Sequence, residues 1–149
     1  MWSTEKLQVR DRESDNSWFS QLFVSLSANR DMALPGRTRI WHPPTDVYET
    51  DTHVMVKIEV AGVTKSDFMV RLRGRSLSVA GHRGDPETKL AYQQMEISYG
   101  AFLSEVNLPC DVDEDDVRAN YENGFLHVML PKLQQEHRVP VVVVIEHQA

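Results

Sequence analysis

The sequence predicts an all-β domain, an antiparallel β-sandwich, and three features of its middle segment carry the prediction. Between residues 53 and 130, apolar residues recur at every second position in several short runs. Turn-forming residues separate the runs, and no stretch between them has the periodicity of an amphipathic helix. Several short strands joined by turns are typical of two sheets that bury their inner faces against each other.

The first strand is expected at residues 53–61, HVMVKIEVA, where β-branched residues occupy alternate positions. Alternate side chains of a strand point to opposite faces, so this run has one buried and one polar face. The same alternation predicts further strands at 68–72, 77–79, 102–108, 117–121 and 126–130. Gly62 ends the first run, Gly74 marks a tight corner, and Asn123-Gly124 is a two-residue hairpin signal.

The amino-terminal residues follow a different pattern. Apolar side chains fall at helical spacing and predict a short amphipathic helix; they are Trp18, Phe19, Leu22, Phe23 and Leu26. Two interpretations stay open: the helix packs on its own domain, or it presents an apolar surface to partners.

The carboxyl-terminal residues form a polar linker, 132–138, and then the run VPVVVVI at 139–145. Pro140 cannot donate a hydrogen bond to a sheet, which disfavours a central strand there. An uncharged valine run promotes aggregation unless something covers it. Because a complete domain precedes the linker, cover by a neighbouring subunit is favoured over cover by the run's own domain.

Charge divides the chain of 149 residues, whose formal net charge is −6. Residues 1–40 carry +1, residues 41–131 carry −7, and residues 132–149 are neutral. The acidic balance argues against a nucleic-acid partner. The longest uncharged apolar run, 139–145, is far shorter than the ~20 residues of a membrane-spanning helix. The predicted helix at 18–26 lacks the basic face that stable membrane association would need.

The sequence contains no recognisable motif for a catalytic site or a metal site. The six histidines include no pair at helical i, i+4 spacing and have no cysteine pair beside them, so we expect no zinc site. Nucleophile-elbow and phosphate-loop motifs are missing, and Cys110 lies beside carboxylates that disfavour its thiolate. The acidic run 111–116 is interpreted as a solvated loop.

A single cysteine and no secretory signal pattern suit a cytoplasmic protein. We therefore expect a binding or assembly protein without a cofactor, and no enzyme.

Several motifs stand in the order and spacing of one known family. They are PTDVYE at 44–49, VKIEVAGV at 56–63 with Lys65-Ser-Asp67 after it, GRSLSVAGHR at 74–83, YGAF at 99–102, Leu108-Pro109 and, the most specific, ANYENGFLHVMLPK at 119–132. Over roughly residues 43–145 the chain resembles a small heat-shock protein of the alpha-crystallin family, bacterial or archaeal type.

The resemblance implies an immunoglobulin-like sandwich at 41–132, a partly helical arm at 1–40 and an extended tail at 133–149. It also implies an ATP-independent holdase, which binds partly unfolded client proteins and prevents their aggregation. Such proteins work as homo-oligomers built from dimers. A second class stays open: a co-chaperone or scaffold domain with the same sandwich that binds one folded partner. Domains of that class usually lack the tail motif and the long loop described next.

The segment GDPETKLAYQQME at 84–96 is too long for a hairpin turn. In bacterial and plant members the matching loop bears a strand that partners exchange, and the resemblance places it at Leu90, Ala91, Tyr92 and Gln93. Family members also carry a tail anchor of two branched aliphatic residues, matched here by Val139 and Val141. The registers Val141/Val143 and Val143/Ile145 stay open. The groove that receives the anchor would be lined by Val70, Leu72, Val117, Ala119 and Tyr121.

Client binding is expected in the amino-terminal arm, because irregular apolar surface on a client requires adaptable apolar side chains. The arm offers Trp2, Trp18, Phe19, Leu22, Phe23 and Met32. One position departs from the family pattern: Ser104 stands where an arginine usually follows the phenylalanine by two residues, and that arginine commonly forms ion pairs near the dimer contact. Glu105 and Arg83 are the charged residues that could reorganise near it.

Overall fold

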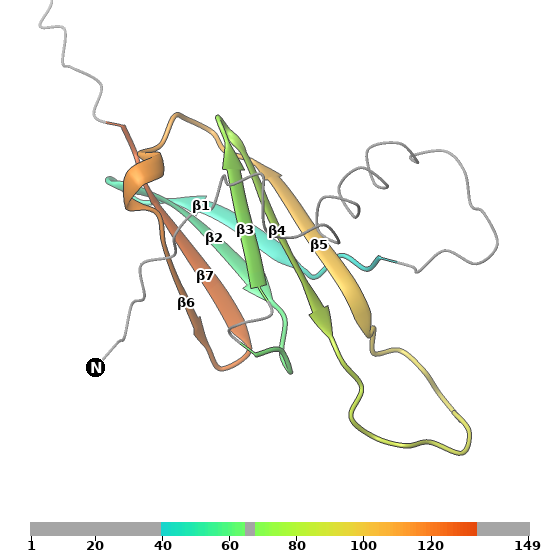
Figure 1. Ribbon diagram of the computed structural model, residues 1–149. Coiled ribbons are helices and arrows are strands. Elements are labelled where there is room, and N and C mark those ends of the chain that lie inside the picture. The colour runs from blue at the N-terminus through green and yellow to red at the C-terminus, as the bar shows by residue number, and fades with distance from the viewer. Residues whose placement is uncertain (1–39, 65–67, 134–149) are drawn as a thin grey trace, which may run out of the picture.

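Two antiparallel sheets form the protein in the computed structural model, which describes residues 40–64 and 68–133. The elements are β1 (Thr45–Glu49), β2 (His53–Glu59), β3 (Phe68–Arg73), β4 (Ser76–Arg83), β5 (Gly100–Asn107), the 3-10 turn η2 (Glu114–Asp116), β6 (Arg118–Glu122) and β7 (Phe125–Pro131). One sheet has the order β1-β2-β7-β6 and the other β3-β4-β5. Figure 1 shows the second sheet lying across the first, which confirms the predicted sandwich.

The core lies between the sheets and follows the predicted alternation. In the register of β2 with β7, Val56 lies opposite Val128 and Ile58 opposite Leu126, and all four side chains are buried. From the facing sheet, Leu77, Val79 and Phe102 complete the same cluster. Burying one such aliphatic side chain stabilises the fold by roughly 1.5–3 kcal/mol, so the alternating runs decide which face turns inward.

The first strand, β1, was not among the strands that alternation predicted. It is an edge strand that pairs only with β2. Its Val47 and Tyr48 are 40% and 45% exposed, so the strand has no buried face that would impose a two-residue period.

The predicted Asn-Gly hairpin is confirmed between β6 and β7. Asn123 and Gly124 have φ of 51° and 81°, the left-handed pair that a two-residue hairpin needs. The carbonyl of Gly124 accepts a hydrogen bond of 2.8 Å from Val60 N–H. A Cβ at Gly124 would lie 3.0 Å from the Cβ of Ala61, so the hairpin also packs closely on the chain after β2.

The segment before β1 covers one edge of the three-stranded sheet. Trp41 donates its N–H to Ala101 O and accepts from Leu103 N–H, both at 3.1 Å. These bonds form a short parallel bridge to β5. Within residues 40–64 and 68–133 there is no helix long and apolar enough to cross a membrane. The predicted helix at 18–26 and the valine run at 139–145 lie outside the described residues.

Candidate assembly surfaces

A long loop, residues 84–99, leaves β4 and returns to β5 without forming a strand of its own. Figure 1 shows it projecting clear of both sheets. All four residues predicted for exchange are exposed; they are Leu90, Ala91, Tyr92 and Gln93. Leu90 is fully exposed, and Met95 and Ile97 are each 62% exposed. Sequence reasoning missed these last two, although their two-residue spacing places them on one side of an extended chain.

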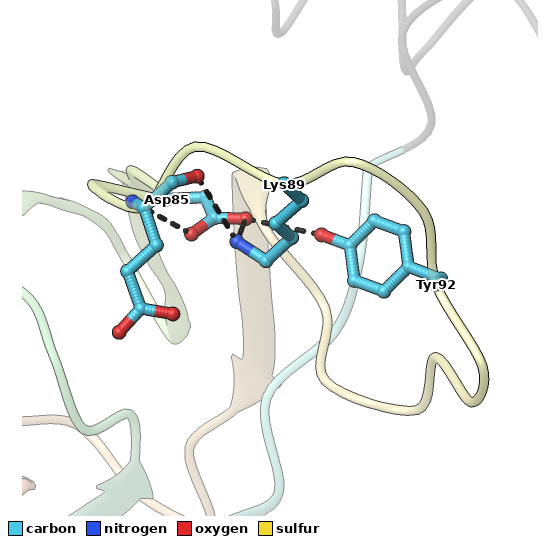
Figure 2. A network of polar contacts seen from close by, with 4 residues as sticks. Asp85, Lys89 and Tyr92 are labelled. Atoms are coloured by element: carbon cyan, nitrogen blue, oxygen red, sulfur yellow. Dashed lines mark hydrogen bonds and ion pairs between the residues drawn. The ribbon is translucent and has the colours of Figure 1, made fainter.

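Residues 85–92 of the loop, called the crest from here on, are held by a polar network around Asp85 (Figure 2). The Asp85 carboxylate accepts hydrogen bonds from Lys89 Nζ and, at 3.1 Å, from the Tyr92 hydroxyl. Lys89 also donates to the carbonyl of Glu87 at 3.2 Å. The hydrogen bond from Lys89 lowers the pKa of Asp85 and correspondingly raises the pKa of Lys89. The pKa of Tyr92 is raised, mainly because its hydroxyl is partly removed from solvent and secondly because it donates a hydrogen bond to Asp85.

The base of the loop is held by Arg83, the last residue of β4. Its Nε and one terminal nitrogen donate to the carbonyl of Ser98 at 2.8 and 2.5 Å. Its other terminal nitrogen donates to the carbonyl of Ala61 at 3.1 Å. The guanidinium lies 4.2 Å from the centre of the Trp41 ring and 5.7 Å from that of Tyr99. Arg83 therefore joins the two ends of the loop to each other and to the turn after β2.

Ser104, at the usual arginine position, lies on the inner face of β5 and is only 7% exposed. Its Oγ is 2.6 Å from Thr45 Oγ1. The Thr45 hydroxyl oxygen is also 3.0 Å from Pro43 O, so the two hydroxyls and this carbonyl form a short hydrogen-bonded series in which either hydroxyl can donate to the other. Glu105 is exposed on the opposite face of β5, and Arg83 is engaged at the loop base.

The five residues predicted to line the tail groove belong to the main core cluster between the sheets or pack against it. They come from β3, from β6 and from Val117 just before β6, and β3 and β6 are edge strands of different sheets. Leu72, Val117 and Ala119 are buried, whereas Val70 and Tyr121 are half-buried and keep accessible surface. Phe68, which sequence reasoning left out, lies 5.0 Å from Tyr121 between ring centres. The alternation of Phe68 with Val70 would have identified it.

The acidic run is an exposed turn tied down by two ion pairs. Asp111 accepts from Arg75 Nε at 2.9 Å, and Asp116 from Arg118 at 3.2 Å. The hydrogen bond from Arg75 lowers the pKa of Asp111. In the part of the chain that the structure describes, no group of His, Cys, Asp or Glu side chains could hold a metal ion. The predicted client-binding residues and the tail anchor lie outside that part.

Comparison with known proteins finds similar heat shock proteins, both among known sequences and among solved structures. The chain is 32% identical over 124 residues to heat shock protein 16 of Schizosaccharomyces pombe, a match that covers 80% of this chain and 84% of the relative. It is 30% identical over 95 residues to small heat shock protein C2 of Rickettsia felis, spanning 62% of each. Among solved structures, HSP18.5 from E. histolytica is similar with a TM-score of 0.58 and 30% identity, over 69% of this chain and 99% of that one.

The sequence model of the Hsp20/alpha crystallin family matches residues 46–145. That range includes every strand except the first residue of β1 and covers more than half of the chain. The chain therefore belongs to the Hsp20/alpha crystallin family of small heat-shock proteins.

Proposed function

We propose that the protein is an ATP-independent holdase chaperone, which binds partly unfolded proteins and works as a homo-oligomer built from dimers. One observation carries the proposal: a well-packed sandwich projects a loop whose Leu90, Met95 and Ile97 are largely exposed. Large apolar side chains gathered on one projecting segment mark a surface for association. Family membership supports the chaperone class of function.

The edge of β1 is the proposed acceptor for the loop of a second copy. Of the strands at sheet edges, β5 is bridged by Trp41, and β3 and β6 border the groove proposed for the tail. The remaining edge, β1, pairs with β2 on one side and exposes Val47 and Tyr48. An unpaired edge offers backbone N–H and C=O groups that an extended segment can pair with. Residues 90–93 would then become a strand only in the dimer.

The tail would join dimers into a larger assembly. Val139 and Val141 would point to the same side of an extended tail and fill the surface left by Val70 and Tyr121 on a neighbouring copy. Burial of each valine contributes roughly 1.5–3 kcal/mol, weak enough for subunits to exchange and sufficient when repeated around a shell. The arm at 1–40 would bind clients through Trp2, Trp18, Phe19, Leu22, Phe23 and Met32, in the cytoplasm.

The test combines native mass measurement with a heat-aggregation assay on an unfolding client protein. The full chain should form oligomers with an even number of subunits and suppress light scattering by the client. Deletion of residues 86–95 should leave folded monomers. Leu90→Asp should weaken the dimer, and Asn107→Asp is the control for the added charge, because Asn107 is exposed at the end of β5 away from the loop.

Two further variants test the proposed roles of the tail and of the amino-terminal arm separately. Val139→Ala with Val141→Ala should reduce the oligomer to smaller species, and an unchanged size would exclude that register of the anchor. Deletion of residues 1–40 should abolish client protection and leave the sandwich folded. A full chain that is monomeric and does not protect clients would overturn the proposal and favour a domain that binds one folded partner.

A further inference from the structure

A continuous series of cations and aromatic rings runs from the body of the sandwich to the crest of loop 84–99. Arg83 lies over Trp41 at 4.2 Å and near Tyr99 at 5.7 Å. Lys89 lies 5.8 Å from the same Tyr99 ring and 5.5 Å from the ring of Tyr92. Together these residues, Trp41, Arg83, Tyr99, Lys89 and Tyr92, are called the cation–ring stack here. Each spacing is within the ~6 Å at which a cation is attracted to a ring face.

Hydrogen bonds fix the stack at both ends. At the base, Arg83 donates twice to Ser98 O, on the returning limb of the loop, and once to Ala61 O. The stem of Arg83 crosses the turn after β2, where its Cδ lies 3.6 Å from the Cβ position of Gly62. At the crest, Asp85 joins Lys89 to Tyr92 (Figure 2). The outgoing limb, the crest and the returning limb are thus connected through side chains.

We propose that this stack pre-organises loop 84–99 for association with a second copy, and that Arg83 is the residue that positions it. The inference rests on the proposed dimer and goes beyond it by naming what holds the loop in a projecting form. A loop that is ordered before association loses less conformational entropy when it binds, so the dimer forms more tightly and dissociates more slowly. Leu90, Met95 and Ile97 are exposed, and none of them belongs to the stack.

Substitutions at the base and middle of the stack test the proposal in the full chain. Arg83→Met removes the hydrogen bonds and the cation, and Tyr99→Leu removes the ring between Arg83 and Lys89. Arg83→Lys keeps the charge but not the planar fork, and Tyr99→Phe keeps the ring. Arg118→Met is the matched control, since Arg118 is an exposed strand arginine whose ion pair is with a residue two positions away.

Two measurements are needed: subunit exchange between unlabelled and ¹⁵N-labelled chains by native mass spectrometry, and amide hydrogen exchange. Arg83→Met and Tyr99→Leu should each speed subunit exchange by about tenfold, which corresponds to ~1.4 kcal/mol. Their amide exchange should rise at residues 84–99 and stay unchanged in β2 and β7. Arg83→Lys should give an intermediate rate, and Tyr99→Phe and Arg118→Met should match the wild type.

Wild-type rates of subunit exchange and of loop amide exchange in both Arg83→Met and Tyr99→Leu would overturn the role of the stack and leave the proposed dimer intact. Amide exchange that rises equally in β2 and β7 would also overturn it, because it would mark Arg83 as a general stabiliser of the fold. A wild-type chain that is monomeric would instead refute the dimer. The loop amide measurement reports on the stack independently of that result.

Discussion

Ser104 offers the sharpest test of how the sandwich accommodates its departure from the family pattern. The side chain is 7% exposed, and its hydroxyl shares a 2.6 Å hydrogen bond with Thr45 Oγ1, which connects β5 of one sheet to β1 of the other. Ser104→Ala should remove one net hydrogen bond, worth about 0.5–1.5 kcal/mol. Since the stability of a small protein falls by about 1–3 kcal/mol per molar urea, each kcal/mol shifts the urea midpoint by roughly 0.3–1 M.

Ser104→Arg, which restores the usual residue of the family, should be far more damaging. The new guanidinium would enter the buried space beside Thr45, whose hydroxyl can accept a hydrogen bond but carries no charge to balance the cation. A buried charge without a partner costs about 3–5 kcal/mol, a large part of the 5–15 kcal/mol that stabilises a typical domain.

Urea unfolding followed by far-ultraviolet circular dichroism, at one fixed protein concentration, measures both substitutions. Ser76→Ala, at the exposed start of β4, is the control and should leave the midpoint unchanged. A double-mutant cycle with Thr45→Val isolates the energy of the hydroxyl pair. If Ser104→Arg unfolded at the wild-type urea concentration, the inner face near β1 would have to admit a cation, and the role assigned to Ser104 would be wrong.

Three further outcomes are expected. Gly124→Ala should lower stability by about 1–2 kcal/mol, because an L-residue at φ 81° is strained and its Cβ would meet Ala61; Gly84→Ala, with open space around it, is the control in the same thermal melt. Tyr121→Phe should remove the 2.9 Å hydrogen bond to Val60 O and lower the unfolding free energy by about 0.5–1.5 kcal/mol without changing oligomer size. The Asp85 pKa is lowered, so Asp85 should stabilise the crest above its ordinary pKa of about 3.9 and lose that effect as pH falls through the lowered value. Because the pKa of Lys89 is raised, its bond to Asp85 should stabilise the crest below about pH 10.4 and be lost as pH rises through the raised value. Protection of the loop amides, corrected for their intrinsic pH-dependent exchange rate, would contradict both expectations if it did not change at low and high pH.

The strands that could be predicted from the sequence are those with one buried face. In residues 53–59 and 125–131, aliphatic residues recur at every second position because every second side chain enters the core. The local sequence pattern therefore shows which face of each strand is buried between the sheets. The strand at 45–49 lacks that pattern because its side chains are largely exposed, and only the family motif marked the segment. The hairpin at Asn123-Gly124 was predictable because its backbone angles restrict the residue types.

The arrangement of the loop could not be predicted in the same way. Its length and exposure follow from composition, but the partners of Arg83 do not. Ser98 and Ala61 are 15 and 22 positions away and are contacted through backbone carbonyls, which any residue carries. Trp41 reaches Arg83 only because its segment bridges to β5. Contacts of this kind are set by the packing of the sheets, so local periodicity carries no record of them.

The distribution of charge explains why association should be confined to a few directional contacts. Residues 41–131 carry −7 and the two ends together only +1, so two sandwiches that approach face to face repel each other. At physiological salt this repulsion is screened beyond about 8 Å, and a loop that projects from the sheets makes contact before the acidic bodies come close. A loop that is held out in advance also binds without first being ordered. In the proposed dimer, net charge would oppose other approaches, while the exposed side chains of the loop and the edge of β1 would determine where two copies join.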